Sequence, residues 1–244
     1  MNSNAVFHWS GGKDSALALR HISQARSHSI KYLLTSVNPE YQRVSMHGVR
    51  VELLKRQAAA VGIPLRILEV PPAPTMEVYN AAMRAMLGRF VREDGIGCSI
   101  FGDIFLEDLR DYRLGELAKV PMTGVFPIWQ RPTQELMAEF IAAGFKAVTV
   151  CVNDRVLDES FVGREIDAAF VADLPAGVDP CGENGEFHTF VYDGPIFREP
   201  VPVQVGEKVH RHYQPAAADT DGVDGCDRTE VDNGFWYCDL LPME

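Results

Sequence analysis

The feature that most constrains this chain is a strand-like run that leads through a glycine turn into a helix. The apolar run Ala5–Trp9 is followed by Ser10–Ser15, with the sequence SGGKDS, and then by the helix-forming residues ALAL. Because glycine has no Cβ, two adjacent glycines allow a tight turn whose N–H groups can approach an anion. The helix N-terminus adds unpaired N–H groups and the positive end of its dipole. Residues 10–15, the phosphate loop, therefore predict an ATP-binding α/β fold.

The phosphate loop differs from a Walker P-loop. A Walker loop has a glycine six residues before its lysine and Ser or Thr directly after it, whereas this chain has Phe7 and Asp14 at these positions. A helix dipole contributes only about 0.3 to 1 kcal/mol per charge at an exposed site. A lysine, hydroxyl groups and a divalent metal ion must therefore share the binding of a triphosphate. The candidate ATP-binding residues of the loop are Ser10, Gly11, Gly12, Lys13, Asp14 and Ser15.

The charge balance and the cysteines narrow the class of protein. With 23 Lys and Arg against 34 Asp and Glu, the net charge is −11, which disfavours the basic surface that nucleic-acid binding needs. The five cysteines contain no C-x-x-C pair, which fits a reducing compartment. The chain has neither a signal-peptide pattern nor an apolar run of about 18 residues, so we expect a cytoplasmic protein without a membrane segment. The sequence leaves the oligomeric state open, a homodimer included.

Apolar periodicity predicts alternating strands and helices in the first half of the chain. Helical spacing is found at residues 15–22, 51–61 and 79–90, and strand-like runs at residues 31–37, 65–70 and 98–101. Strands separated by helices predict a parallel sheet covered by helices on both faces, as in a Rossmann-like fold. The phosphate loop then lies at the carboxyl edge of the sheet, where such folds bind ligands.

The pattern changes after about residue 129. A helix is predicted over residues 133–143 and a short one near 166–170, with strands at 145–152, 188–192, 203–213 and 235–240. We therefore predict two domains. Residues 1–128 form an ATP-binding α/β domain, and residues 129–244 form a smaller α+β substrate-binding domain.

A second unusual segment, residues 181–195, places glycines between carboxylates just before a strand. It reads CGENGEFHTFVYDGP. Glycine lets a loop wrap a ligand, while Glu183 and Glu186 could hold a metal ion or orient a nucleophile. His188 could carry a proton near neutral pH. Taken alone, the segment also fits an ordinary glycine-rich hairpin with exposed glutamates.

The two segments together resemble the diphthine ammonia ligase family within the PP-loop, or N-type, ATP pyrophosphatases of the HUP superfamily. The resemblance covers nearly the whole chain, and the order and spacing of its pieces make it specific. The other matching pieces are SMHG at residues 45–48, QA at 57–58, GIP at 62–64, FGDI at 101–104 and PIW at 127–129.

The resemblance implies a HUP domain followed by a smaller substrate domain. In this family ATP activates a carboxylate, giving an acyl adenylate and pyrophosphate, and ammonia then displaces AMP to leave an amide. The family's substrate is diphthine, the modified histidine of elongation factor 2. By position, the implied catalytic residues are Lys13, Glu183, Glu186 and His188. The phosphate loop, His47, Gly102 and Asp103 would bind ATP, with Asp14 and Asp103 as candidate Mg²⁺ ligands.

The second segment departs from the typical family motif at two positions. Typical ligases read GE-x-GEYET, whereas Phe187 and His188 here give GENGEFHT, which resembles a bacterial subgroup. Bacteria do not make diphthamide, so a PP-loop amidotransferase acting on a small acid or cofactor precursor is an alternative. A non-catalytic ATP-binding sensor is another. The acidic balance and the missing C-x-x-C pair disfavour tRNA thiolation or lysidine formation.

Overall fold

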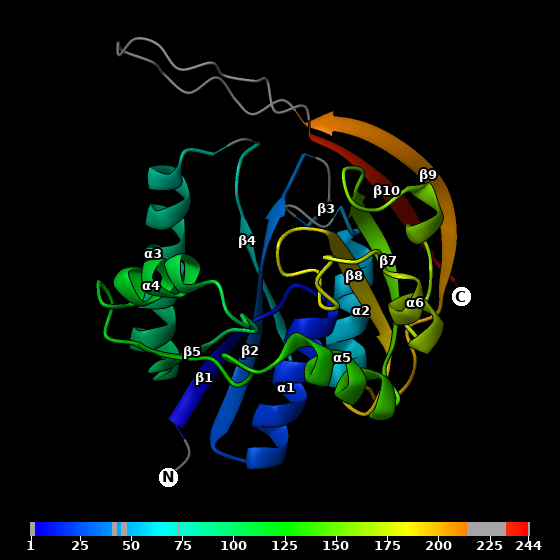
Figure 1. Ribbon diagram of the computed structural model, residues 1–244. Coiled ribbons are helices and arrows are strands. Elements are labelled where there is room, and N and C mark those ends of the chain that lie inside the picture. Colours follow the sequence, from blue (N-terminus) through cyan, green and yellow to red (C-terminus); the bar gives the residue numbers. More distant parts are fainter. Residues whose placement is uncertain (1–2, 41–42, 45–47, 73, 214–232, 244) are drawn as a thin grey trace.

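The larger part of the molecule is a parallel sheet with helices on both faces (Figure 1). This computed structural model describes residues 3–40, 43–44, 48–72, 74–213 and 233–243. Five strands run parallel in the order β4-β2-β1-β5-β6. Their bounds are Ser3–His8 for β1, His28–Asn38 for β2, Leu65–Glu69 for β4, Cys98–Ile100 for β5 and Thr123–Val125 for β6. The short strand β3, Arg43–Val44, pairs antiparallel with the end of β2.

The helices between these strands form two layers. Two of them, α1 (Lys13–Ala25) and α2 (Val51–Val61), cover one face, and α3 (Met76–Asp94) and α4 (Glu107–Leu117) cover the other. The central strand β1 alternates between the layers, since Ala5 and Phe7 belong to the cluster with α1 and α2, whereas Val6 belongs to the cluster with α3. A strand buried on both faces is typical of parallel sheets, and explains the continuous apolar run before the phosphate loop.

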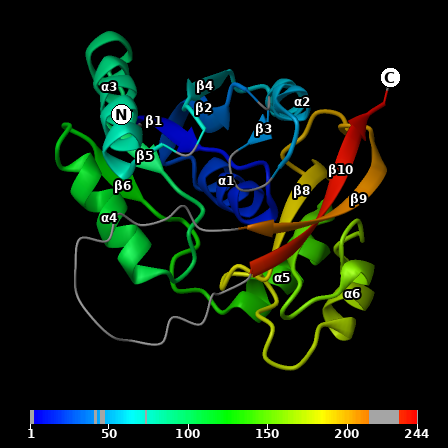
Figure 2. The ribbon, with the colours of Figure 1, turned by 90° about the horizontal axis from the view of Figure 1, so that it is seen from above.

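A second, antiparallel sheet lies beside α1 and α2, on the side away from α3 and α4 (Figure 2). Its strand order is β8-β7-β10-β9. The bounds are Lys146–Asn153 for β7, Phe187–Asp193 for β8, Val203–Tyr213 for β9 and Asn233–Pro242 for β10. The helices of this part are α5 (Thr133–Ala142), the 3-10 helix η1 (Glu159–Phe161) and α6 (Ala168–Asp173).

The predicted fold class is confirmed, with differences at short elements. Helix α6 begins two residues after the predicted start because Asp167 caps it, accepting a hydrogen bond from the N–H of Phe170 at 2.7 Å. The elements β3, α4 and β6 were not predicted. The division at residue 128 stays a prediction, since one apolar cluster contains residues of both sheets, among them Phe7 and Phe190.

Two broader expectations concern membrane segments and cysteines. Within the described ranges, every helix is too short or too polar to cross a bilayer. The four cysteines that the structure describes, Cys98, Cys151, Cys181 and Cys238, are free and buried.

Candidate active site

A cleft of about 760 Å³ opens at the carboxyl ends of β1 and β5. These two strands are neighbours in the sheet, and the chain leaves β1 toward β2 on one side but reaches β5 on the other. Open α/β sheets bind ligands at such a switch point. The cleft is lined by residues of the phosphate loop, by Gly102 and Asp103 after β5, by residues 181–185 of the loop before β8, and by residues 187–189 of β8.

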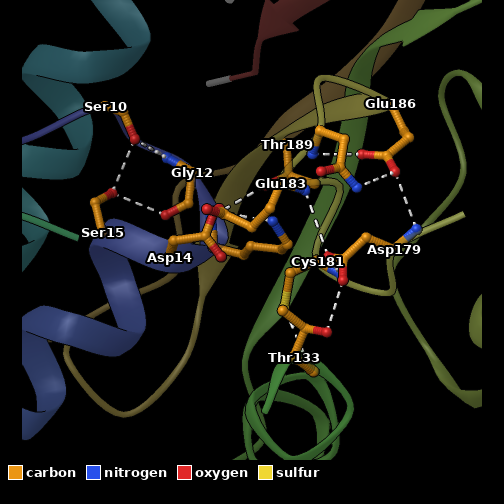
Figure 3. Close-up of polar contacts among 12 residues, drawn as sticks. Ser10, Gly12, Asp14, Ser15, Thr133, Asp179, Cys181, Glu183, Glu186 and Thr189 are labelled. Atoms are coloured by element: carbon orange, nitrogen blue, oxygen red, sulfur yellow. Dashed lines mark hydrogen bonds and ion pairs between the residues drawn. The ribbon is translucent and has the colours of Figure 1, made fainter. Parts of the chain in front are cut away.

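The phosphate loop is closed by its own hydroxyl groups. The N–H of Gly12 donates to Oγ of Ser10 at 3.2 Å, and the Ser10 hydroxyl donates to Oγ of Ser15 at 3.1 Å (Figure 3). The Ser15 hydroxyl in turn donates to the carbonyl oxygen of Gly12 at 2.9 Å. These groups line the cleft at the N-terminus of α1, and each donor has its partner within the loop. An anion bound there would take over these N–H and O–H donors from their partners in the loop.

Glycine is required where the strand end of β5 meets this helix. A Cβ on Gly102 would lie 3.0 Å from the backbone nitrogen of Ser15, which is tighter than nine in ten real Cβ contacts. The backbone of the Gly102-Asp103 pair therefore lies directly against the start of α1, as the shared strand edge predicts.

Lys13 is the buried cation of the cleft. Its Nζ lies 2.9 Å from Oδ2 of Asp14 and 5.2 Å from the centre of the Phe187 ring, and its side chain is 5% exposed. Burial opposes the charge on Lys13, but Asp14, Cys181 and Glu183 outweigh it and hold the pKa of the ammonium above its usual value. Lys13 is therefore a permanently charged group next to the phosphate loop.

Glu183 also lines the cleft, within the glutamate loop, which we define as Cys181–Glu186. Burial, and next to it the negative charge of Asp14, raise the pKa of the Glu183 carboxyl to about 8. A carboxyl with such a pKa exchanges its proton near neutral pH, which suits a general acid or base.

Glu186 lies in the same loop but serves it differently. Its Oε1 accepts hydrogen bonds from the N–H of Asp179 and from Nδ2 of Asn184, both at 3.0 Å, and its Oε2 accepts from the N–H of Asn184 at 2.8 Å (Figure 3). The residue is 5% exposed and is absent from the cleft lining. The geometry thus favours Glu186 as a brace of the glutamate loop, and its predicted contact with the reacting group stays a prediction.

Asp103 is paired with an arginine that the sequence did not point to. The Nε atom of Arg113 lies 2.6 Å from Oδ2 of Asp103, and the guanidinium lies 4.6 Å from the centre of the Phe101 ring. The imidazole of His8 stacks on the same ring at 4.1 Å. Burial and, second, Arg113 lower the pKa of His8 to about 3, so its ring is neutral. No local pattern in the sequence marks Arg113, because its role comes from contacts that the fold makes.

The remaining predicted residues fall in different places. His188 lines the cleft, whereas His47 lies outside the described residues.

Cys181 also lines the cleft. Burial raises the pKa of its thiol to about 12, and its Sγ donates to the carbonyl oxygen of Thr133 at 3.3 Å. This thiol is therefore no nucleophile at neutral pH.

The donor set at the cleft fits a magnesium ion only in part. Among the residues that the structure describes, no group of three or more His, Cys, Asp or Glu side chains is placed to hold a metal ion. Asp14 and Asp103 do line the same cleft. Mg²⁺ usually keeps several waters and binds through one or two carboxylates plus phosphate oxygens, so this pair matches the chemistry of a metal that arrives with a nucleotide.

Comparison with known protein families adds an independent observation. Residues 2–114 match the family model described as the diphthamide synthase N-terminal domain, and residues 132–217 match the diphthamide synthase C-terminal domain. The chain belongs to the diphthine ammonia ligase-like family of PP-loop ATP pyrophosphatases. The two matches include both the phosphate loop and the glutamate loop.

Individual relatives within this family carry the name diphthine–ammonia ligase. The protein from Mus musculus is 31% identical over 110 residues, a match that spans 41% of each chain. Those from Rattus norvegicus and Homo sapiens are each 26% identical over 228 residues, which is 82% of this chain and 82% of theirs.

Proposed function

We propose that this chain is an ATP-dependent ligase that adenylates a carboxylate, releases pyrophosphate and amidates the acyl adenylate with ammonia, as a diphthine ammonia ligase does. The observation that carries the proposal is that the phosphate loop and the glutamate loop line one cleft. Membership of the family and the names of the relatives support the same reaction.

The phosphate loop would hold the β and γ phosphates and stabilise the leaving pyrophosphate. Attack at the α phosphorus transfers negative charge to the departing group, and donors already in place lower the barrier most. Lys13 supplies a buried positive charge for this group, and the Ser10 and Ser15 hydroxyls supply donors. When bound, Mg²⁺ would supply further positive charge at the phosphate oxygens. Asp14 and Asp103 would hold it.

The nucleoside would occupy the part of the cleft that extends along the end of β2. There the lining consists of Leu34, Thr35, Ser36 and the Tyr79 ring from α3. This mixture of apolar and aromatic surface with a few hydroxyl groups is typical of pockets for small molecules and cofactors. The α phosphate would then lie between this region and the phosphate loop.

The glutamate loop would serve the second half of the reaction. When ammonia attacks the acyl carbon, the C–O bond to AMP breaks, and the new C–N group must lose a proton. Glu183 is suited to accept that proton because its pKa of about 8 lies near neutral pH. His188 lines the same cleft and is the other candidate for this proton. Glu186 would act as a positioning residue that fixes the loop.

The test is a product analysis with ATP, Mg²⁺, ammonia and a panel of carboxylates that includes diphthine-bearing elongation factor 2. The proposal expects AMP, pyrophosphate and an amide, formed only when both an acid and ammonia are present. Formation of ADP and orthophosphate would contradict it. Tight ATP binding without pyrophosphate release from any acid would instead favour a non-catalytic sensor.

A second candidate is an amidotransferase for a small acid or cofactor precursor, and one observation favours it. The two positions that differ from the typical motif both lie at the cleft, since Phe187 packs beneath Lys13 and His188 belongs to the lining. A change at these positions would therefore alter the reacting end of the site. The same panel separates the two candidates, because only one of them amidates diphthine.

A further inference from the structure

Gln57 of α2 is a fully buried amide behind the phosphate loop. It is 0% exposed and does not line the cleft. Its Oε1 accepts a hydrogen bond from Nε1 of Trp9 at 3.0 Å. Its Nε2 donates to the carbonyl oxygen of Gly11 at 3.0 Å and to that of Val191 at 2.5 Å. Both amide donors are thus used on backbone carbonyls, one in the loop and one in the second sheet.

The carbonyl of Gly11 is held by two donors. Besides Nε2 of Gln57, the N–H of Val191 on β8 donates to it at 2.9 Å. Because a peptide group is planar and trans, the C=O of Gly11 and the N–H of Gly12 point in opposite directions. Fixing this carbonyl therefore also fixes the Gly12 N–H, which donates to Oγ of Ser10 on the cleft side.

The alternative orientation of this peptide would be harmful to anion binding. Gly11 has φ +80°, a region open to glycine, so a rotation of the following peptide group meets little steric resistance of its own. Such a rotation would place the Gly11 carbonyl oxygen where the Gly12 N–H now lies, and its partial negative charge would repel phosphate. The loop also fits Gln57 closely, since a Cβ on Gly11 would lie 2.7 Å from Oε1 of Gln57.

We propose that Gln57 is a positioning residue for nucleotide binding. It holds the Gly11–Gly12 peptide so that the N–H group faces the phosphates, and it ties this orientation to strand β8 of the second sheet. The inference rests on the proposed function in one respect, namely that the phosphate loop binds ATP. Gln57 itself touches no substrate.

The main test replaces the amide by an apolar side chain of similar length, Gln57→Met. We expect the Kd for Mg-ATP, measured by titration calorimetry, to rise about tenfold, which corresponds to about 1.4 kcal/mol. The kcat at saturating ATP should change much less, because the variant loses binding that the ground state and the transition state share.

The matched control is Thr149→Val in strand β7. Thr149 is also 0% exposed, its hydroxyl donates to the carbonyl oxygen of Phe161 at 2.5 Å, and it does not line the cleft. This variant also loses a buried hydrogen bond and should lower the melting temperature, yet it should leave the Kd for Mg-ATP unchanged. The comparison separates a positioning role from general destabilisation.

A second variant covers the case in which Gln57→Met does not fold. Gln57→Glu keeps the length and the acceptor, but a charged carboxylate would face two carbonyl oxygens. Binding should therefore weaken as pH rises and recover as pH falls, when the protonated carboxyl regains one O–H donor. The wild-type protein, measured in parallel, should lack this recovery.

The outcomes distinguish the inference from the function on which it rests. If the wild-type protein binds no Mg-ATP, the proposed function fails. If the wild type binds it and the Gln57 variants bind it equally tightly at every pH, the function stands and the role of Gln57 is overturned. A Kd that rises as much in Thr149→Val as in Gln57→Met would also overturn it.

Discussion

Oγ1 of Thr189 on β8 accepts a hydrogen bond from the backbone N–H of Lys13 at 3.0 Å, although 176 positions separate the two residues. The first N–H of α1 is therefore engaged by the second sheet and is not a donor toward the cleft. The charge that Lys13 offers to a nucleotide comes from its side chain. The phosphate site is thus built by both sheets, and residues 187–193 matter to it even where they do not contact phosphate.

The clearest prediction concerns the ammonium of Lys13. Lys13→Met keeps most of the stem over Phe187 but removes the charge that would stabilise the leaving pyrophosphate. We expect kcat/KM for ATP to fall by about 10² to 10³, as for the loss of one preorganised donor at developing charge. Pyrophosphate release measures this loss, and circular dichroism checks that the fold is kept.

A surface lysine provides the control. Lys146 pairs with Glu165 on an exposed part of the second sheet, so Lys146→Met should leave pyrophosphate release unchanged. Equal rates of release by Lys13→Met and wild type would remove Lys13 from the reaction.

Much of the fold could be predicted because its longer helices and strands show recognisable patterns of apolar residues in the sequence. The spacing over residues 15–22 gave α1, and the continuous apolar run gave β1, since a strand buried on both faces needs no alternation. Helix α4 was missed because Leu117 is its one buried residue among eleven. The strands β3 and β6 have two and three residues, too few to show a period.

The residues of the candidate site also fall into two groups, those that a local sequence pattern marks and those that only contacts in the folded chain reveal. The phosphate loop could be proposed from the sequence because a glycine turn after a strand is a local feature, whereas Gly102 came from the family resemblance. The binding roles of both stay predictions. The burial of Glu186 was not predicted, since no periodicity in a loop fixes which of the two glutamates lines the cleft. Arg113 and Thr189 were missed because their roles arise from contacts across the fold.

The two glutamates of the glutamate loop should respond differently to the same substitution. Glu186→Gln places an NH₂ group among the N–H donors of Asp179 and Asn184, so at least one buried donor loses its acceptor. We expect the protein to lose about 1 to 3 kcal/mol of stability, measured by urea unfolding. Glu183→Gln should keep this stability and lose amide formation. A stable Glu186→Gln protein would contradict the bracing role.

The raised pKa of Glu183 predicts how the free energy of unfolding of the ligand-free protein depends on pH. Its pKa is about 8 in the folded state against an ordinary value of 4.5. Between these values the folded state binds the proton more than the unfolded chain does, so the contribution of this group to stability falls as pH rises. The Gln side chain of Glu183→Gln cannot ionise. The difference between the melting temperature of this variant and that of the wild type should therefore shift in favour of the variant as pH rises from about 4.5 to 8, and should stay constant above that range.

The size of this effect is readable by scanning calorimetry. Each kcal/mol of difference appears as about 2 to 4 °C in a chain of this length. Glu93→Gln, which removes a carboxylate that is 63% exposed on α3, serves as control and should show a constant offset. A constant offset for Glu183→Gln as well would mean that its carboxyl titrates normally.

The last prediction concerns metal binding. Since no cluster of three or more candidate ligands exists among the residues described here, Mn²⁺ used as a paramagnetic probe should bind weakly to the protein alone. It should bind tightly once ATP supplies phosphate oxygens. Asp14→Asn and Asp103→Asn should each weaken the ternary complex about tenfold, or by about 1.4 kcal/mol.

Asp173→Asn removes an exposed partner of Arg164 and should leave the Mn²⁺ signal of the ternary complex unchanged. The electron paramagnetic resonance signal of free Mn²⁺ measures how much of the ion each of these complexes has bound. If one aspartate variant alone weakens the complex, that residue is the ligand and the other serves its arginine or lysine partner, because each carboxylate is already in an ion pair. Tight Mn²⁺ binding without ATP would mean that the protein forms a complete metal site by itself, which the carboxylates in the described part of the chain do not provide.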